Sequence, residues 1–227
     1  MKSKLTFLTL LLAVLFSCKK TTNVDLELST SGKLAYKLTD DAGKAIPNVK
    51  VSLLVNNDHY SNYVLLDSRV TDGNGQADFG DLNAGNYQVV SDSARVNNIP
   101  YLVKELVQVT AGAAKTKETK VTDFSGTYVM SVKSSNNSQP LKNVGVLLIP
   151  SARYSYNSTT ANQLKVAHFS GLTNDAGVVS FKVPSDMGYY VYVYNTVTNA
   201  SYSGYGGYYS NFTVQRGATV NNTYTIY

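Results

Sequence analysis

The residues of this chain that could carry out catalysis are few and lie far apart. The 227 residues include two histidines, His59 and His168, and one cysteine, Cys18. A hydrolase needs a nucleophile, a base and a group that orients the base, and no serine here lies in the glycine pattern of a nucleophile elbow. Zinc needs several ligands at short spacings, which two isolated histidines do not supply. We therefore expect no catalytic residue, no metal and no cofactor, and an enzyme is the least favoured function.

One acidic segment carries side-chain oxygens that could bind calcium. It reads Asp72-Gly73-Asn74-Gly75-Gln76-Ala77-Asp78, with Asp81 beyond it. A calcium loop needs oxygens at alternating positions, a correctly placed glycine and a bidentate glutamate. Here the glycine is displaced and no such glutamate follows. Asp-Gly and Asn-Gly pairs tolerate the positive φ of tight turns, so we expect a hairpin turn rather than a calcium site.

The single cysteine lies where a secretory leader would end. Lys2 and Lys4 precede an apolar run from Leu5 to Phe16, and Ser17 and Cys18 follow. A run of about 12 residues is shorter than the ~20 that span a bilayer, and the layout is that of a signal peptide. Acylation of Cys18 would account for an unpaired thiol in an exported protein, and several acyl chains would anchor it stably. The alternative is an ordinary cleaved signal with a cysteine nearby by chance.

The end of this leader, Leu15-Phe16-Ser17-Cys18, resembles a bacterial lipobox, and with Lys19 and Lys20 it is similar to lipoproteins of the Bacteroidetes. This resemblance implies that the membrane is a partner, through acyl chains on Cys18. Surface display in that phylum is linked to acidic residues just after the cysteine, whereas here Asp25 and Glu27 come late. We expect an outer-membrane lipoprotein of the cell envelope, with the surface and periplasmic faces both open.

Composition favours an all-β protein and argues against nucleic-acid binding. The formal net charge of +5 falls to +3 when the leader, with its two lysines, is removed. The nearest approach to a basic cluster, Lys115, Lys117 and Lys120, is interrupted by Glu118, and no dense basic stripe appears. Eighteen tyrosines, no tryptophan and abundant valine and threonine are typical of β-sheets.

The chain repeats one pattern of four blocks in the same order, which indicates a duplication. The paired blocks are 43–51 and 138–146, 71–79 and 173–181, 85–87 and 188–190, and 109–113 and 214–218. Short segments with turn signals between them predict a sandwich or barrel, and no stretch shows a sustained helical period. The strands expected are 33–39, 47–56, 62–70, 75–80, 86–92, 101–109 and 114–121, then 126–133, 143–150, 163–171, 177–182, 189–197, 209–214 and 219–226.

The repeated motifs resemble the carboxypeptidase regulatory-like, or collagen-adhesin B-type, repeats of transthyretin-like fold. The resemblance covers nearly all of residues 30–227 and implies two tandem seven-stranded Greek-key β-sandwich (transthyretin/Ig-like) domains after a lipoprotein signal peptide. Some relatives contain a Lys–Asn isopeptide bond, and Lys37 has roughly the position of that lysine. The acid expected after Tyr87 is replaced by Val89 and Ser91, and residues 117–121 contain no asparagine, so we expect no such bond.

Tyrosines are densest between Tyr189 and Tyr209. In the strand-like part we expect Tyr190, Tyr192 and Tyr194 to face the core or a sandwich edge and the intervening valines to face outward. The glycine-rich part that follows has the Tyr, Ser and Gly mixture that binding loops use. The alternative is that its tyrosines fold back onto the sandwich. The candidate ligand-binding residues are Tyr202, Tyr205, Tyr208 and Tyr209, with Tyr154 and Tyr156 from a second loop.

A weaker motif, Asp92-Ser93-Ala94, resembles the acceptor of Bacteroidetes O-glycosylation, so Ser93 is a possible glycosylation site; a plain turn explains it equally. The expected organisation is a signal peptide over 1–17, the lipidated cysteine and tether over 18–29, and sandwich repeats over 30–122 and 123–227. We expect a non-enzymatic, lipid-anchored protein that acts in adhesion, carbohydrate binding or scaffolding. Its partner would be a glycan or an envelope protein. The alternative is a periplasmic accessory or assembly factor that docks on an envelope protein.

Overall fold

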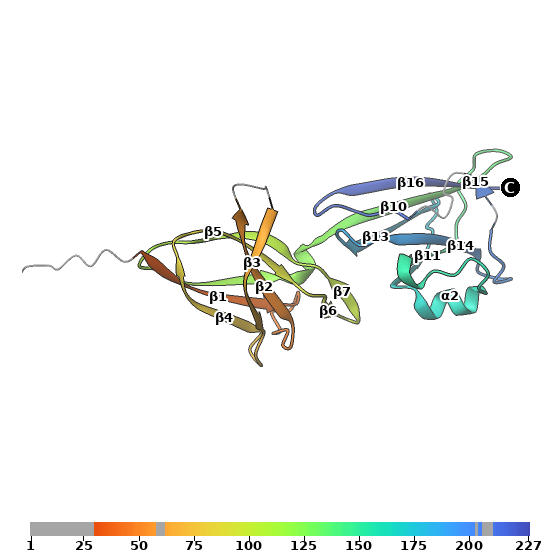
Figure 1. Cartoon of the computed structure of the whole chain (residues 1–227). Coiled ribbons are helices and arrows are strands. Elements are labelled where there is room, and N and C mark those ends of the chain that lie inside the picture. The colour runs from red at the N-terminus through yellow and green to blue at the C-terminus, as the bar shows by residue number, and fades with distance from the viewer. Residues whose placement is uncertain (1–29, 58–61, 203, 206–210) are drawn as a thin grey trace, which may run out of the picture.

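The computed structural model describes residues 30–57, 62–202, 204–205 and 211–227, which form an all-β structure (Figure 1). The first half contains β1 (Ser31–Thr39), β2 (Lys50–Asn57), β3 (Asn62–Val70), β4 (Gln76–Asn83), β5 (Gly85–Ser91), β6 (Ala94–Val96), β7 (Ile99–Tyr101), β8 (Lys104–Val109) and β9 (Ala114–Lys120). The second half contains the 3₁₀ turns η1 (Val121–Asp123) and η2 (Ser151–Arg153), the helix α2 (Thr160–Val166), and β10 (Ser125–Ser134), β11 (Val144–Pro150), β12 (Phe169–Leu172), β13 (Val178–Pro184), β14 (Tyr189–Asn195), β15 (Gly204–Tyr205) and β16 (Thr219–Ile226). The predicted all-β sandwich class is confirmed.

Each half is built from two sheets with matching connectivity. In the first half the strand orders are β4-β1-β9 and β3-β2-β5-β8, with β6-β7 as a separate hairpin. In the second half they are β13-β10-β16-β15 and β12-β11-β14. In both halves the first strand pairs antiparallel with the fourth main strand and parallel with the last, as in β1 with β4 and β9 and β10 with β13 and β16. The sequence duplication is therefore also a duplication of topology.

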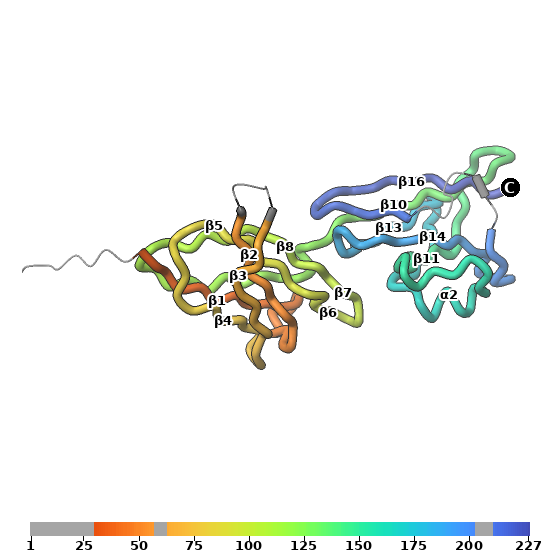
Figure 2. Tube along the Cα trace, viewed as in Figure 1, coloured from red at the N-terminus to blue at the C-terminus, as the bar shows by residue number. Residues whose placement is uncertain are grey.

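The buried side chains form two main clusters, one in each half. The first extends from Leu34 to Phe124 and the second from Tyr128 to Ile226. Between them the chain passes through η1, which is held to the first half by a hydrogen bond from Thr122 to the Asp41 carboxylate. The two halves also touch, since β7 contacts β13. Figure 2 shows the β6–β7 hairpin reaching toward the second half. The division into two domains at residue 122 stays a prediction.

The repeated Thr-Asp/Asn motif has the same structural role in both halves. The buried Thr71 hydroxyl donates to Ile46 O and accepts from the Val49 amide. Thr173 makes the equivalent bonds to Leu141 O and from the Val144 amide. Each threonine thus fixes the turn before the second strand of its half, which explains why the motif recurs.

The segment weighed as a calcium loop is a tight turn, but it is not the hairpin turn that was predicted, because the strands it joins, β3 and β4, belong to different sheets. Asp72 Oδ1 accepts hydrogen bonds from the amides of Asn74 and Gln76, both at 2.9 Å. Asn174 Oδ1 does the same for Ala176 and Val178 in the second half, at 3.0 Å. Asp72 and Asn174 accept the same pair of backbone hydrogen bonds although only one of them is charged. The side-chain oxygen at this position therefore serves to accept hydrogen bonds within the turn.

Three predictions about elements were wrong. The strand expected over 163–171 is replaced by α2 and the shorter β12, because Thr159 caps a helix, its side chain accepting from the Asn162 amide. A helix of seven residues is too short to give a sustained period. The strand expected over 209–214 lies partly outside the described residues, and Phe212 makes a single bridge to Tyr189. The β6–β7 hairpin was missed, and β8 starts at Lys104 rather than 101.

The orientation of β14 also differs from the prediction. Val191 and Val193 face the second core, whereas Tyr192 and Tyr194 lie on the opposite face with Leu147 and Ile149. That face is covered by the segment from Tyr154 through Ala167, which includes α2. The sheet β12-β11-β14 is therefore covered on both sides, as sheets with near-continuous apolar strands are, and every residue of β11 is buried. The alternation of residues in β14 could not predict this orientation, because it does not show that a second segment of the chain covers the outer face.

Candidate ligand-binding site

The predicted site residues fall into two groups. Cys18 and the side chains of Tyr205, Tyr208 and Tyr209 lie outside the described residues. Tyr154, Tyr156 and Tyr202 are placed by the structure, and so is Ser93, which is exposed between β5 and β6. The exposure of Ser93 is compatible with modification but does not test it.

Two of the predicted tyrosines come together with a third that the sequence assigned to the core or a sandwich edge. Tyr154 stacks on Tyr190, with ring centroids 4.5 Å apart and planes inclined by 23°. Tyr156 meets Tyr154 edge to face at 5.0 Å and approaches Tyr190 at 6.1 Å. Offset stacking and edge-to-face contacts are the favourable arrangements of aromatic rings. We call Tyr154, Tyr156 and Tyr190 the tyrosine cluster.

The tyrosine cluster is open to solvent on one side. Tyr156 is 66% exposed, and Tyr154 and Tyr190 are half-buried. Tyr190 is held by β14, which pairs with β11 through Tyr190 and Ile149. Tyr154 follows η2, and its amide donates to Pro150 O at 3.1 Å. The cluster is thus an aromatic platform that a rigid strand and a short turn hold in place.

A pair of polar side chains, Ser151 and Asn211, lies next to the segments that hold the platform. The Ser151 hydroxyl donates to the Asn211 side-chain oxygen at 2.6 Å, and the Ser151 amide donates to Gly188 O at 3.0 Å. A Cβ at Gly188 would lie 2.4 Å from Asn211 Oδ1, so glycine permits this close approach. Asn211 comes directly after the undescribed segment 206–210. The tyrosine-rich loop therefore ends beside η2, which leads to Tyr154.

Tyr202 does not belong to the tyrosine cluster. Its hydroxyl accepts from Asn195 Nδ2 at 2.8 Å, and its carbonyl accepts from the Tyr224 hydroxyl at 2.7 Å. It packs against the second core. Asn195 lies five residues along β14 from Tyr190, which corresponds to ~17 Å of strand. For Tyr202 the alternative of folding back onto the sandwich is therefore what the structure shows.

The described histidine, His168, pairs with a buried tyrosine. His168 Nδ1 lies 3.3 Å from the Tyr189 hydroxyl, and burial, followed by the charges of Arg153 and Arg95, lowers its pKa. Tyr189 is buried, its hydroxyl donates to the Met187 sulfur at 3.1 Å, and burial raises its pKa. His59 lies outside the described residues. Within the described part of the chain, no three His, Cys, Asp or Glu side chains gather as metal ligands would.

A second polar cluster, which the sequence did not indicate, lies at the end of the first core. Glu105 accepts hydrogen bonds from the hydroxyls of Tyr36 and Thr119, both at 2.5 Å, and Lys117 Nζ lies 3.6 Å from its other oxygen. Burial, followed by the Glu105 hydrogen bond, raises the pKa of Tyr36. The alternation of side chains along β8 could have indicated this cluster, because it places Glu105 on the same inward face as Val107 and Val109.

Lys37, weighed above as an isopeptide lysine, lies away from this cluster. Its Nζ forms an ion pair with Glu118 at 3.1 Å, and both side chains are substantially exposed. The group that reaches the buried carboxylate from the first strand is the Tyr36 hydroxyl instead. The cross-connection from β1 through β8 to β9 is therefore made by hydrogen bonds.

Across residues 30–57, 62–202, 204–205 and 211–227, no helix is long and apolar enough to cross a membrane.

The chain matches no family model and no curated protein. Among solved structures it is similar to the Bacillus anthracis TIE protein, with 15% identity and a TM-score of 0.36 over 87% of this chain and 34% of that one. It is similar to a streptococcal ancillary pilin, with 14% identity and a TM-score of 0.34 over 86% of this chain and 62% of that one. The minor pilin GBS52 of Streptococcus agalactiae gives 13% identity and a TM-score of 0.38 over 88% and 97%. The chain thus spans about a third and three fifths of the first two, and likeness at this level supports no conclusion about activity.

Proposed function

We propose that this chain is a non-enzymatic binding protein of the cell envelope and that the tyrosine cluster binds a glycan. The observation that carries the proposal is the open platform of Tyr154 and Tyr190 with Tyr156 at its edge. Rigid tyrosine rings offer a large amphipathic contact area at low entropic cost, and the apolar face of a sugar ring can stack on them. Ser151 and Asn211 supply hydrogen-bonding groups beside the rings for sugar hydroxyls.

The proposal also includes the anchor. Cys18 would carry the acyl chains and residues 19–29 would act as a tether of at most ~36–40 Å at ~3.3–3.6 Å per residue. Globomycin, which blocks cleavage of lipoprotein signals, should leave the precursor uncleaved, and Cys18→Ser should release the protein from the membrane fraction. Protease treatment of intact cells separates the two faces: digestion indicates the surface and protection indicates the periplasm.

The glycan proposal is tested by binding of residues 18–227 to an array of neutral and acidic glycans, followed by titration of the best ligand. Tyr190→Ala and Tyr156→Ala should each weaken binding of that ligand about tenfold, because truncation of a tyrosine that anchors a binding site costs more than about 1 kcal/mol. Tyr63→Ala is the matched control, since Tyr63 is an exposed strand tyrosine of the first half. A ligand that binds both cluster variants as tightly as the parent would refute the role of the cluster.

The tyrosine-rich loop is tested separately. The double variant Tyr205→Ala and Tyr208→Ala should reduce binding if the loop extends the platform from Asn211. Unchanged binding in this variant, with loss in Tyr190→Ala, would confine the site to the described tyrosine cluster.

A second candidate function, docking of a periplasmic accessory on an envelope protein, is favoured by one feature of the first half. β3 is an edge strand of the sheet β3-β2-β5-β8, and it exposes Tyr63, Val64, Leu65 and Leu66, at 42 to 56%. Exposed apolar edges can accept an added strand. The occupant would be an extended apolar segment of that partner. Cross-linking in cells should capture one defined envelope protein, and Leu65→Lys should abolish the cross-link while glycan binding is retained.

A further inference from the structure

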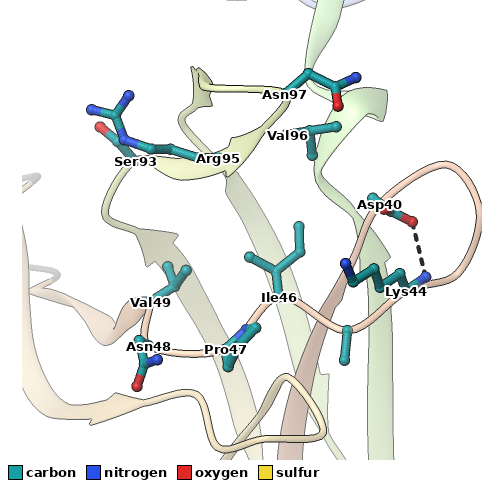
Figure 3. A pocket seen from close by; sticks show the side chains of 11 residues that line it. Asp40, Lys44, Ile46, Pro47, Asn48, Val49, Ser93, Arg95, Val96 and Asn97 are labelled. Atoms are coloured by element: carbon teal, nitrogen blue, oxygen red, sulfur yellow. Dashed lines mark hydrogen bonds between the residues drawn. The ribbon is translucent and has the colours of Figure 1, made fainter.

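A cavity of about 510 Å³ lies in the first half, away from the tyrosine cluster. It is bounded by the loop between β1 and β2 and by the β6–β7 hairpin with the turn that precedes it (Figure 3). Its lining residues are Asp40, Lys44, Ala45, Ile46, Pro47, Asn48, Val49, Ser93, Arg95, Val96 and Asn97. The volume lies within the ~300–1,000 Å³ typical of small-ligand pockets. Among the described residues of the second half, no hairpin corresponds to β6–β7.

Two cationic side chains line the cavity from its two walls. Lys44 belongs to the loop and Arg95 to the hairpin, and both are exposed. Arg95 donates one hydrogen bond, from Nη1 to Asn98 O at 3.0 Å, which fixes the guanidinium and leaves its other donors for a ligand. Neither side chain forms an ion pair within the part of the chain that the structure describes.

One carboxylate, Asp40, shares this lining. Its Oδ1 accepts hydrogen bonds from the amides of Ala42 and Lys44, both at 2.9 Å, and Figure 3 shows the bond to Lys44. These bonds hold the carboxylate to its own loop. With two cations and one restrained carboxylate, the lining favours an anion, and arginine in particular suits carboxylate groups.

The rest of the lining is divided between apolar and amide groups. Ile46 and Val49 rise from the loop toward the hairpin and Val96 lies opposite (Figure 3). Asn48 and Asn97 have positive φ values of 60° and 51°, a backbone conformation that asparagine tolerates better than most residues. Figure 3 shows the Asn48 amide pointing away from the hairpin, so the uncharged hydrogen-bonding side chains offered to a ligand are Ser93 and Asn97 on the hairpin wall, beside the apolar floor of Ile46, Val49 and Val96.

We propose that this cavity binds an acidic sugar residue, such as a hexuronate, of a polysaccharide. The carboxylate would pair with Arg95, and Lys44 on the opposite wall would donate to a ring hydroxyl. The C–H face of the pyranose ring would lie on Ile46 and Val96, and the other hydroxyls would bond to Ser93 and Asn97. Inorganic phosphate would use the cations alone and leave the apolar floor exposed. An acidic peptide would offer a carboxylate on a flexible stem without ring hydroxyls. The acidic sugar is the class that uses every part of the lining.

The test is calorimetric titration of residues 18–227 with digalacturonate and with the neutral disaccharide galactobiose. Digalacturonate should bind at least about tenfold more tightly, and Arg95→Gln and Lys44→Gln should each lower its affinity about tenfold, since each substitution removes a charge-assisted hydrogen bond to the ligand. Lys50→Gln is the matched control, because Lys50 is an exposed lysine on β2 outside the lining. Circular dichroism and thermal melts establish that each variant is folded.

Three results would overturn the proposal: no binding of digalacturonate, an equal loss in Lys50→Gln, or equal competition by inorganic phosphate or triglutamate at the same concentration. The proposal for the cavity and the proposal for the tyrosine cluster can be refuted independently. Tyr156→Ala should leave digalacturonate binding at the cavity unchanged, and Arg95→Gln should leave the ligand of the tyrosine cluster unchanged.

Discussion

The hydroxyl of Tyr36 on β1 donates a 2.5 Å hydrogen bond to the carboxylate of Glu105 on β8. Thr119 on β9 donates to the same Glu105 oxygen, so one side chain joins three strands that come from both sheets of the first half. The Glu105 side chain is only 14% exposed. A largely buried carboxylate stabilises the fold only when its hydrogen-bond donors are present. We therefore expect substitution of Glu105 or of its partners to lower the stability of the protein.

Glu105→Ala should lower the free energy of unfolding by about 2 kcal/mol, because the hydroxyls of Tyr36 and Thr119 lose their acceptor and unpaired buried polar groups cost about 1–3 kcal/mol each. Urea denaturation at neutral pH measures the effect. Glu118→Ala is the control: its exposed ion pair with Lys37 should be worth less than about 1 kcal/mol. Equal effects of the two substitutions would contradict the structural role assigned to Glu105.

The stability of the protein should fall as the pH rises above about 10, the ordinary pKa of tyrosine. Burial raises the pKa of Tyr128 to about 12, and the Asn222 hydrogen bond opposes this shift. In the unfolded chain the same hydroxyl ionises near pH 10, so between pH 10 and 12 the unfolded state binds fewer protons and stability decreases with pH. Burial also raises the pKa values of Tyr36 and Tyr189, so these residues contribute to the pH dependence with the same sign.

Tyr128→Phe tests that pH dependence. Denaturation series from pH 9 to 11.5 should show a shallower loss of stability for Tyr128→Phe than for the parent protein, because one of the raised groups is gone. Parallel curves for the two proteins would show that Tyr128 ionises alike in the folded and unfolded states.

Gly75→Ala should destabilise the protein by about 1–3 kcal/mol, because strained backbone conformations have costs of that order. Gly75 has a φ of +74°, and a Cβ there would lie 2.6 Å from Leu38 O. Gly177, its counterpart in the second half, has a φ of +69° and the same close approach, to Val132 O at 2.5 Å. Thermal unfolding of each variant measures the cost.

Gly73→Ala is the control for both glycines. Gly73 lies in the same turn as Gly75 but without a positive φ, and a Cβ there would meet nothing within 4 Å. The substitution should change stability by less than about 0.5 kcal/mol. A loss as large as that of Gly75→Ala would mean that the turn tolerates no side chain at all, and the φ argument would be wrong.

Arg216→Ala should loosen the junction between the halves. The guanidinium lies 3.8 Å from the centroid of the Phe124 ring, and its Nε donates to Asp123 O at 3.1 Å. The neighbouring Gly217 amide donates to Ser125 O at 2.8 Å and should exchange with solvent deuterium several-fold faster in the variant. Arg216→Lys keeps the charge and should show a smaller effect. Exchange at the parent rate in Arg216→Ala would show that the arginine does not hold this bond.

The sequence determined the β architecture and most of the turns. Alternating apolar residues such as Leu34, Tyr36 and Leu38 predict a half-buried strand, and all three are fully buried in β1. The Thr71 and Thr173 motifs predicted the duplication because the same residue types recur in the same order, whereas their hydrogen bonds join residues 22 to 32 positions apart and were supplied by the structure. The strand pattern and the repeat are properties of the residue order, so the sequence alone contains them.

The candidate sites depended on contacts between distant residues. The stack of Tyr154 on Tyr190 joins a turn and a strand 36 positions apart along the sequence, and the face of β14 that is buried was decided by the α2 segment that covers it. The cavity forms where the β1–β2 loop and the β6–β7 hairpin come together. The hydrogen bond between Tyr36 and Glu105 joins residues that are 69 positions apart. Alternation along a strand shows that its two faces differ, but only the packed structure shows what covers each face. For that reason the sequence determined the strands of this protein, and the tertiary structure decided which side chains form its surfaces.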